Sequence, residues 1–251
     1  MRDVSQEKIM SRALSLRRVA FGLWIALFPL FVVMLLWPVN SRSLRMGILI
    51  TASGLILGSL ILSWRRRAVF FALVGLYSSI GLFLLLPGHQ PENLAEFHKP
   101  YIEAMAAYEG VQYVWGGENR LGIDCSGLVR KGLEDALLKN GILSLNPFLV
   151  RGAIDLWWND TTASEIGRGY DGRTIHVTTC SSLNTLDPSS ILPGDMAVTT
   201  SGIHVMAYLG NDKWIGADPG EMKVTIFTIP ETKNGWFSSP MNIVRWNKIK
   251  G

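Results

Sequence analysis

The chain has 251 residues, of which 48% are hydrophobic, and carries a formal net charge of +4 at pH 7. Residues 1–90 hold ten lysines and arginines against two acidic residues, whereas residues 91–251 hold fourteen against eighteen. The net positive charge of the chain therefore comes from residues 1–90. Because residues 91–251 are net acidic, their charge argues against a nucleic-acid-binding surface there, and we expect no nucleic-acid partner.

Three apolar stretches without a charged residue follow one another in the first part, at about 19–37, 46–64 and 68–86. Each has the length that a helix needs to cross a hydrocarbon layer of roughly 30 Å. A cleaved signal peptide explains them less well, because two further full-length stretches follow the first. The sequence predicts that 1–90 is a membrane anchor of three transmembrane helices in a lipid bilayer, followed by a globular domain at 91–251.

The positions of lysine and arginine predict the orientation of this anchor. Five lie in residues 1–18, two lie between the first and second stretches, and three lie at 65–67. With the N-terminus in the cytoplasm, the inner side carries eight and the first outer loop two. Three crossings then place the domain outside the cytoplasm, on the periplasmic or cell-wall side.

The domain follows a linker at 87–92 and is expected to begin near Asn93, with helices first. Residues 93–109 carry an apolar stripe at helical spacing, and Gly110 is the expected C-terminal cap. Residues 126–139 predict a second helix, which Asn140 and Gly141 should end.

Residues 140–190 are poorly patterned and could form a lid or a binding wall. Beyond them, short runs between turn residues predict strands at 196–199, 203–209, 213–217, 224–229 and 242–246. Helices followed by a small antiparallel sheet define an α+β domain.

Cys125 lies in the stretch YVWGGENRLGIDCSGLV, at the start of the second predicted helix. Unpaired N–H groups and the helix dipole favour a thiolate there, so we interpret Cys125 as a nucleophile. The alternative is a buried structural cysteine. A disulfide with Cys180 would consume the nucleophile, so we expect Cys180 to be buried or free. His176 and Cys180 have no second Cys/His pair nearby, so we expect neither a metal nor a cofactor.

His204 lies at the start of the predicted strand 203–209. A cysteine at a helix N-terminus, packed against a sheet that presents a histidine, is an arrangement used for nucleophilic acyl chemistry. A single cysteine and histidine far apart in sequence are weak support by themselves.

The first stretch, together with LPGDMAV at 192–198 and GIHVMAYLGNDKWI at 202–215, resembles the NlpC-type cysteine peptidases, which are papain-like cell-wall hydrolases. The resemblance covers about residues 97–246. It implies a papain-like fold and, as substrate, peptidoglycan stem peptides, cut between D-glutamate and the diamino acid.

The resemblance also implies roles for single residues. Cys125 corresponds to the nucleophile and His204 to the general base. Tyr113, twelve positions before the cysteine, corresponds to the residue whose hydroxyl helps to line the oxyanion site. Asp124 and Ser126 match the pair that contacts the free amino end of the stem peptide.

One position departs from the pattern of the family, which usually has a polar residue twelve positions after the catalytic histidine. Here that position is Gly216. Asp218 points to the same face of the predicted strand and could reach His204 Nδ1. The alternatives are that Asp218 is a turn residue before Pro219, and that a water or a backbone carbonyl orients the imidazole.

Three functional hypotheses follow. The first is a membrane-anchored cysteine endopeptidase acting on stem peptides through a thioester. The second is an amidase or acyltransferase with the same Cys-His chemistry on a lipid or protein, which a deep apolar tunnel beside Cys125 would favour over an open polar groove. The third is a non-catalytic wall- or lipid-binding module, which the glycine at 216 suggests.

Overall fold

A computed structural model describes residues 2–91 and 94–250, without the side chains of residues 2–17, 95 and 96. The chain divides into two compact units, Met1–Trp37 with Ser41–Phe83, and Pro38–Asn40 with Leu84–Gly251. The expected domain start at Asn93 lies outside the described residues. The second unit thus includes the short segment between the first two predicted spans, which the sequence had assigned to the anchor.

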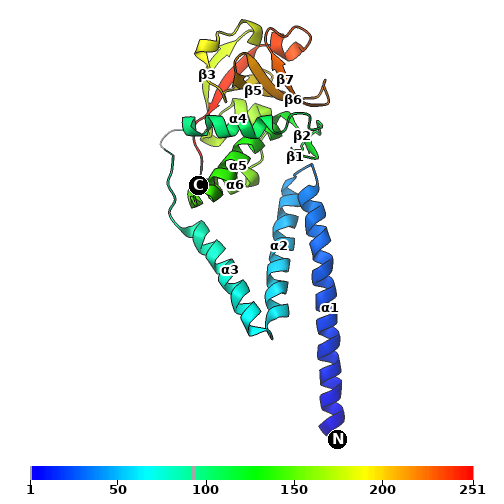
Figure 1. Cartoon of the computed structure of the whole chain (residues 1–251). Coiled ribbons are helices and arrows are strands. Elements are labelled where there is room, and N and C mark those ends of the chain that lie inside the picture. Colours follow the sequence, from blue (N-terminus) through cyan, green and yellow to red (C-terminus); the bar gives the residue numbers. More distant parts are fainter. Residues whose placement is uncertain (1, 92–93, 251) are drawn as a thin grey trace. The chain divides into compact units, whose positions relative to one another are not determined.

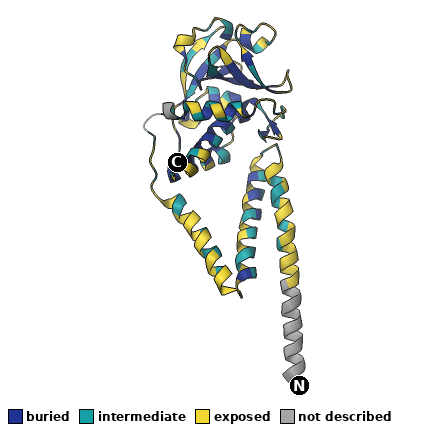
Figure 2. Cartoon of the chain, viewed as in Figure 1, coloured by how far each residue is buried: buried dark blue, intermediate teal, exposed yellow. Residues whose placement is uncertain are grey.

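The first unit consists of three helices, α1 (Arg2–Leu36), α2 (Arg42–Ser63) and α3 (Arg67–Leu85) (Figure 1). The last two residues of α3 belong to the second unit. Three segments are long and apolar enough to cross a membrane, Arg18–Leu36, Arg42–Ser63 and Arg67–Leu85, which agree with the three predicted spans. Many of their large apolar side chains are exposed (Figure 2). Gly58 packs against Trp24, where a Cβ atom would lie 2.2 Å from the indole, so the missing side chain lets α1 and α2 approach closely.

The second unit is an α+β domain, as the sequence predicts. Its helices and helical turns are η1 (Leu94–Phe97), α4 (His98–Ala106), α5 (Cys125–Leu143), α6 (Pro147–Trp158), α7 (Ala163–Gly167), η2 (Tyr170–Gly172), η3 (Leu183–Thr185), η4 (Pro188–Ser190) and η5 (Gly235–Ser238). Its strands are β1 (Glu118–Asn119), β2 (Gly122–Ile123), β3 (Thr174–Cys180), β4 (Met196–Thr199), β5 (Val205–Gly210), β6 (Lys213–Asp218), β7 (Lys223–Thr228) and β8 (Met241–Trp246).

The larger sheet has the strand order β3-β8-β4-β5-β6-β7, and every neighbouring pair is antiparallel. Helices α4, α5 and α6 lie below the sheet in Figure 1, and α5 contacts β5 and β6. Two apolar clusters form the core. One contains Leu128 and Leu133 of α5 with Val205 of β5, and the other contains Met206 and Phe237. Because side chains alternate along a strand, Val205 and Met206 serve the two faces of one sheet.

The sequence misjudged the region after residue 139. Helix α5 does not end at Asn140 but runs to Leu143, and Gly141 packs where a Cβ atom would lie 2.9 Å from the backbone nitrogen of Val150. Gly141 therefore serves the contact with α6 rather than a helix stop. The poorly patterned stretch 140–190 contains α6, α7 and the strand β3, which pairs only through β8 at the edge of the sheet.

The linker expected at 87–92 is attached to the domain over its described part. The Arg151 guanidinium donates hydrogen bonds to the carbonyl oxygens of Leu84 and Leu86, both at 2.8 Å. Asn146 donates another, also 2.8 Å long, to the carbonyl oxygen of His89. The chain that leaves the third predicted span is thus fixed along α6 and is not a free tether.

Candidate active site

Cys125 is the first residue of α5 and is 7% exposed. Asp124 caps this helix, since its Oδ1 accepts hydrogen bonds from the Gly127 N–H at 2.6 Å and from the Ser126 hydroxyl at 3.0 Å. Its Oδ2 accepts a third from the Gly116 N–H at 2.8 Å. The carboxylate that the resemblance assigns to substrate binding is therefore also the N-terminal cap of the cysteine helix.

Two glycines of the first motif allow the backbone to approach this helix. Gly116 has φ +71°, in the left-handed region that favours glycine. At Gly127, a Cβ atom would lie 2.3 Å from the carbonyl oxygen of Gly117, so no other residue fits without a backbone shift. The carbonyl of Gly117 also accepts the Asp124 N–H at 3.1 Å. The segment before the cysteine is thus packed directly onto the start of α5.

The thiol of Cys125 is not poised as a thiolate. Burial, followed by the nearby Asp124 carboxylate, raises the pKa of Cys125 from 9.0 to about 12. Backbone N–H groups of Val205, Ser126 and Cys125 act in the opposite direction but are outweighed. The helix N-terminus therefore contributes the expected stabilisation of negative charge, and burial overrides it. Cys125 and Cys180 are both free, as expected.

His204 lies immediately before β5 rather than within it, and it is buried. The Thr199 hydroxyl accepts its backbone N–H at 3.1 Å, and the Thr199 N–H donates to its carbonyl at 3.0 Å. The backbone N–H of Val205, the residue that follows, acts to lower the pKa of the Cys125 thiol, and α5 contacts β5. The sheet thus brings the predicted histidine to the start of the strand that packs on the cysteine helix. Among the described residues no hydrogen bond joins the thiol to the imidazole.

Trp236 of η5 holds the imidazole of His204 by stacking. The two ring centroids are 4.6 Å apart and the ring planes differ by 19°. Trp236 is not among the residues predicted from sequence, because it lies 32 positions after the histidine in a segment without a recognisable motif. No local pattern could have indicated it, because only the folded chain brings η5 to the start of β5.

Gly216 lies beside the imidazole, as its position twelve residues after His204 implies. A Cβ atom there would be 3.7 Å from His204 Nε2 and 2.8 Å from Met206 Cγ. Nε2 is buried and has no hydrogen-bond partner among the residues that the structure describes. The ring nitrogen that faces Gly216 is thus Nε2, not Nδ1. No residue in the described part of the chain takes the place of the polar side chain that the family usually has at this position.

Asp218 does not supply the expected hydrogen bond to His204. Its Oδ1 accepts the N–H groups of Gly220 at 2.6 Å and Glu221 at 3.0 Å, and its Oδ2 accepts the Asn234 amide at 2.7 Å. The carboxylate is buried and engaged in ordering the turn after β6 and the segment that carries Trp236. It acts on His204 only through its charge, which raises the pKa of the imidazole.

That electrostatic effect is smaller than the effect of burial. Burial lowers the pKa of His204 from 6.5 to about 4 against the opposing charge of Asp218. With the raised pKa of Cys125, this means that the resting pair at neutral pH is a neutral thiol and a neutral imidazole. The arrangement suits a histidine that accepts the thiol proton only during attack.

Tyr113 lies in the same electrostatic environment. Burial, then the charges of Cys125, Asp124 and Asp218, raise its pKa from 10.0 to about 12. Its backbone is fixed by donation of its N–H to the carbonyl of Met222 at 2.9 Å. The structure therefore brings together the nucleophile and the tyrosine that the resemblance assigns to the oxyanion site, with a hydroxyl that remains a hydrogen-bond donor at neutral pH.

An open groove with a volume of about 650 Å³ lies beside Trp236. Its lining includes Trp236, Asp218, Glu221, Asn234 and Lys233, but neither Cys125 nor His204. Most of its accessible lining is apolar, and it is open rather than a deep tunnel. Among the side chains that the structure describes, no group of three or more His, Cys, Asp or Glu residues is arranged to hold a metal ion.

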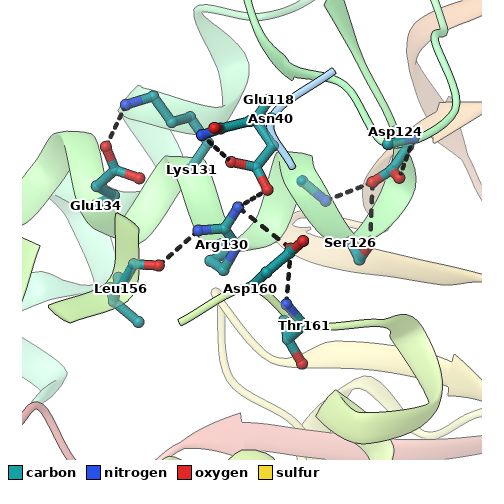
Figure 3. Close-up of polar contacts among 12 residues, drawn as sticks. Asn40, Glu118, Asp124, Ser126, Arg130, Lys131, Glu134, Leu156, Asp160 and Thr161 are labelled. Carbon is teal, nitrogen blue, oxygen red and sulfur yellow. Dashed lines mark hydrogen bonds and ion pairs between the residues drawn. The ribbon is translucent and has the colours of Figure 1, made fainter. Parts of the chain in front are cut away.

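A buried ion pair joins the cysteine helix α5 to the strand β1 (Figure 3). Arg130 is 0% exposed, pairs with Glu118 and donates to the carbonyl of Leu156 at 2.6 Å. Burial opposes its charge, but Glu118 and Glu134 outweigh this and raise the pKa of Arg130. The sequence analysis missed this pair, since its members lie on different elements and match no motif.

The model of the NlpC/P60 family matches residues 110–146. The resemblance is confirmed over this segment. The NlpC/P60 segment contains Tyr113, Asp124, Cys125 and Ser126, whereas His204 lies beyond it. No curated protein sequence matches the chain.

Solved structures of NlpC/P60 proteins are similar at low identity. NlpC1 from Trichomonas vaginalis is 20% identical, over 63% of this chain and 46% of its own, with a TM-score of 0.38. The peptidoglycan hydrolase RipB from Mycobacterium tuberculosis is 21% identical, over 64% and 70%, with a TM-score of 0.40. NlpC2 from Trichomonas vaginalis is 18% identical, over 63% and 48%, with a TM-score of 0.37. The chain thus spans about half the length of the two Trichomonas proteins.

Proposed function

We propose that the protein is a membrane-anchored cysteine endopeptidase that hydrolyses amide bonds in peptidoglycan stem peptides, between D-glutamate and the diamino acid. The observation that supports this most directly is the packing of the cysteine helix against the strand that His204 precedes. Cys125 is the first residue of α5, α5 contacts β5, and β5 begins at Val205, directly after His204. The NlpC/P60 match supports the substrate class.

The chemistry follows from the neutral resting pair. As Cys125 Sγ forms a bond to the carbonyl carbon, its proton passes to His204. Nδ1 is the nitrogen for this step, since Nε2 faces Gly216. The oxyanion is held by the Cys125 N–H at the helix start and the Tyr113 hydroxyl. The C–N bond then breaks as the amine takes the proton from His204, and water hydrolyses the resulting thioester to a carboxylate and a free thiol.

The three crossings proposed from sequence also have support. Residues 38–40 follow the first predicted span, and in the second unit they pair with residues 116–118, which follow the third. Two segments that pair must lie on one side of the membrane, and two crossings between them satisfy this. The orientation rests on the lysines and arginines at 1–18 and 65–67, which favour the cytoplasmic side for those segments. We therefore propose that the domain lies outside the cytoplasm, near the bilayer surface.

One observation favours the non-catalytic binding module over an enzyme. Nε2 of His204 has no partner among the described residues, so the imidazole lacks the polar orienting group that the family provides.

The test uses the full chain in lipid nanodiscs with purified peptidoglycan and isolated stem peptides, and mass spectrometry identifies the products. A cut between D-glutamate and the diamino acid that disappears in Cys125→Ala supports the proposal, since this variant removes only a sulfur atom from the core. Intact substrate with the wild-type protein would point to the binding module or to another acyl substrate. Cleavage by the alanine variant would refute the nucleophile assignment.

A further inference from the structure

Residues 38–40 pair with residues 116–118, in the segment that precedes the cysteine helix. Val39 pairs with Gly117 in an antiparallel bridge, the Glu118 N–H donates to the carbonyl of Pro38 at 2.9 Å, and the Asn40 N–H donates to the carbonyl of Gly116 at 3.3 Å. These three residues therefore act as a short extra strand beside the segment that precedes the cysteine helix.

Asn40 reaches the cysteine helix by two separate routes. Through the backbone, its N–H binds the Gly116 carbonyl, and the Gly116 N–H binds Asp124 Oδ2, the carboxylate that caps α5. Through the side chain, its Nδ2 donates to Glu118 Oε2 at 2.8 Å, and the other oxygen of Glu118 pairs with Arg130 (Figure 3). Arg130 lies five residues after Cys125 on the same helix.

The second route depends on the donor that Asn40 supplies. Glu118 is 7% exposed and Arg130 is 0% exposed, so both charges have lost their water. A buried carboxylate needs hydrogen-bond donors on both oxygens to offset its desolvation. Arg130 serves Oε1 and Asn40 serves Oε2. Losing the Asn40 amide weakens the hold of Glu118 on Arg130.

We propose that Asn40 is a positioning residue of the active site, which holds the start of α5 through Asp124 and through the Glu118–Arg130 pair. The site is then incomplete without a residue that precedes two of the three predicted spans. The proposal rests on the position of Cys125 and holds whichever acyl substrate the protein takes.

The variant that tests it is Asn40→Asp, which keeps the size of the side chain but turns the donor toward Glu118 into a second carboxylate. Adding Glu118→Gln to Asn40→Asp restores the hydrogen bond in the reverse direction, because the glutamine amide can donate to the new aspartate. The double variant and the two single variants form a double-mutant cycle. Asn140→Asp is the matched control, because Asn140 lies on α5 but its amide donates only to the carbonyl of Ala136.

The readout is site-specific alkylation of the full chain in nanodiscs by iodoacetamide, followed for Cys125 and Cys180 by mass spectrometry. Because burial protects Cys125, a loosened helix start exposes it, and we expect Asn40→Asp to raise its alkylation rate at least fivefold. Cys180, in β3, reports on the rest of the sheet and should stay within twofold. The double variant should return toward wild type, and Asn140→Asp should have no effect.

An unchanged Cys125 rate in Asn40→Asp would overturn the proposal, as would a parallel rise at Cys180, which indicates general destabilisation. Turnover of stem peptides by Asn40→Asp should fall at least tenfold in kcat with KM within threefold. A loss confined to KM would also refute a positioning role. If the wild-type protein cuts no stem peptide but the alkylation pattern holds, the proposed function fails while the role of Asn40 stands.

Discussion

Trp236 stacks on His204 with ring centroids 4.6 Å apart, beside a position where Gly216 has no side chain to offer. In this protein a ring face, rather than a hydrogen bond to Nε2, fixes the plane of the imidazole among the described residues. Aromatic contacts of this kind contribute roughly 0.5–1.5 kcal/mol beyond the area that they bury. The arrangement keeps the imidazole oriented and dry at the same time.

Replacing Trp236 by leucine should therefore lower kcat by roughly ten- to a hundredfold, since small misplacements of a reacting group have effects of this size. Water would also reach the imidazole, so its lowered pKa should rise and the acid limb of the kcat/KM profile should move to higher pH. Trp236→Phe should lose less activity. Trp157→Leu is the control, because Trp157 makes a tilted ring contact with Trp158 of the same helix, away from His204 in the sequence. An unchanged profile in Trp236→Leu would mean that the stack does not position His204.

The buried His204 should make stability depend on pH. Its pKa is 6.5 when unperturbed and about 4 in the folded chain, so between these values the unfolded chain binds more protons. Stability is therefore fully present above pH 6.5 and declines as the pH falls toward 4, by roughly 3 kcal/mol. Denaturant unfolding of the nanodisc-embedded chain should show this decline. His204→Gln should remove the contribution of His204 and leave that of His98, whose pKa burial also lowers, whereas the change of the exposed His176 to Gln should preserve the full decline.

The thiol of Cys125 should react slowly at neutral pH. Because its pKa is raised to about 12, its alkylation rate should keep rising about tenfold per pH unit beyond pH 9, where an ordinary thiol levels off. The rate of alkylation by iodoacetamide, measured by quenching at set times and mass spectrometry over a pH series, is compared between Cys125 and free cysteine. Rapid reaction with a plateau near neutral pH would show instead that the helix N-terminus dominates over burial.

A soluble fragment of residues 91–251 should be a poorer enzyme than the full chain. It lacks Asn40, which donates to Glu118, and the carbonyl groups of Leu84 and Leu86, which accept from Arg151. Each unsatisfied buried polar group destabilises by about 1–3 kcal/mol. We expect a lower unfolding midpoint and a lower kcat than for the full chain in nanodiscs. Equal values for both forms would show that residues 38–40 and 84–90 are dispensable.

Much of the molecule could be predicted from local patterns. The three apolar stretches, the helix that begins at Cys125 and the strands β4 to β8 each follow from hydrophobic spacing and turn residues within one segment. The stop expected at Asn140 was wrong because Gly141 serves a contact with α6, which no local signal reveals. The strand β3 was missed because its pattern is weak and it pairs only at the edge of the sheet.

The sequence by itself predicted which residues carry the chemistry, because Cys125, His204 and Tyr113 match positions of the family within two motifs. Only the tertiary structure decided how those residues are supported. Trp236, Asn40 and the Glu118–Arg130 pair come from segments distant in the chain, and they meet because the sheet and the helices pack on one core. The charge state of the site was decided in the same way. A helix N-terminus is a local feature that favours a thiolate, but burial depends on the whole fold, and here it is the stronger effect.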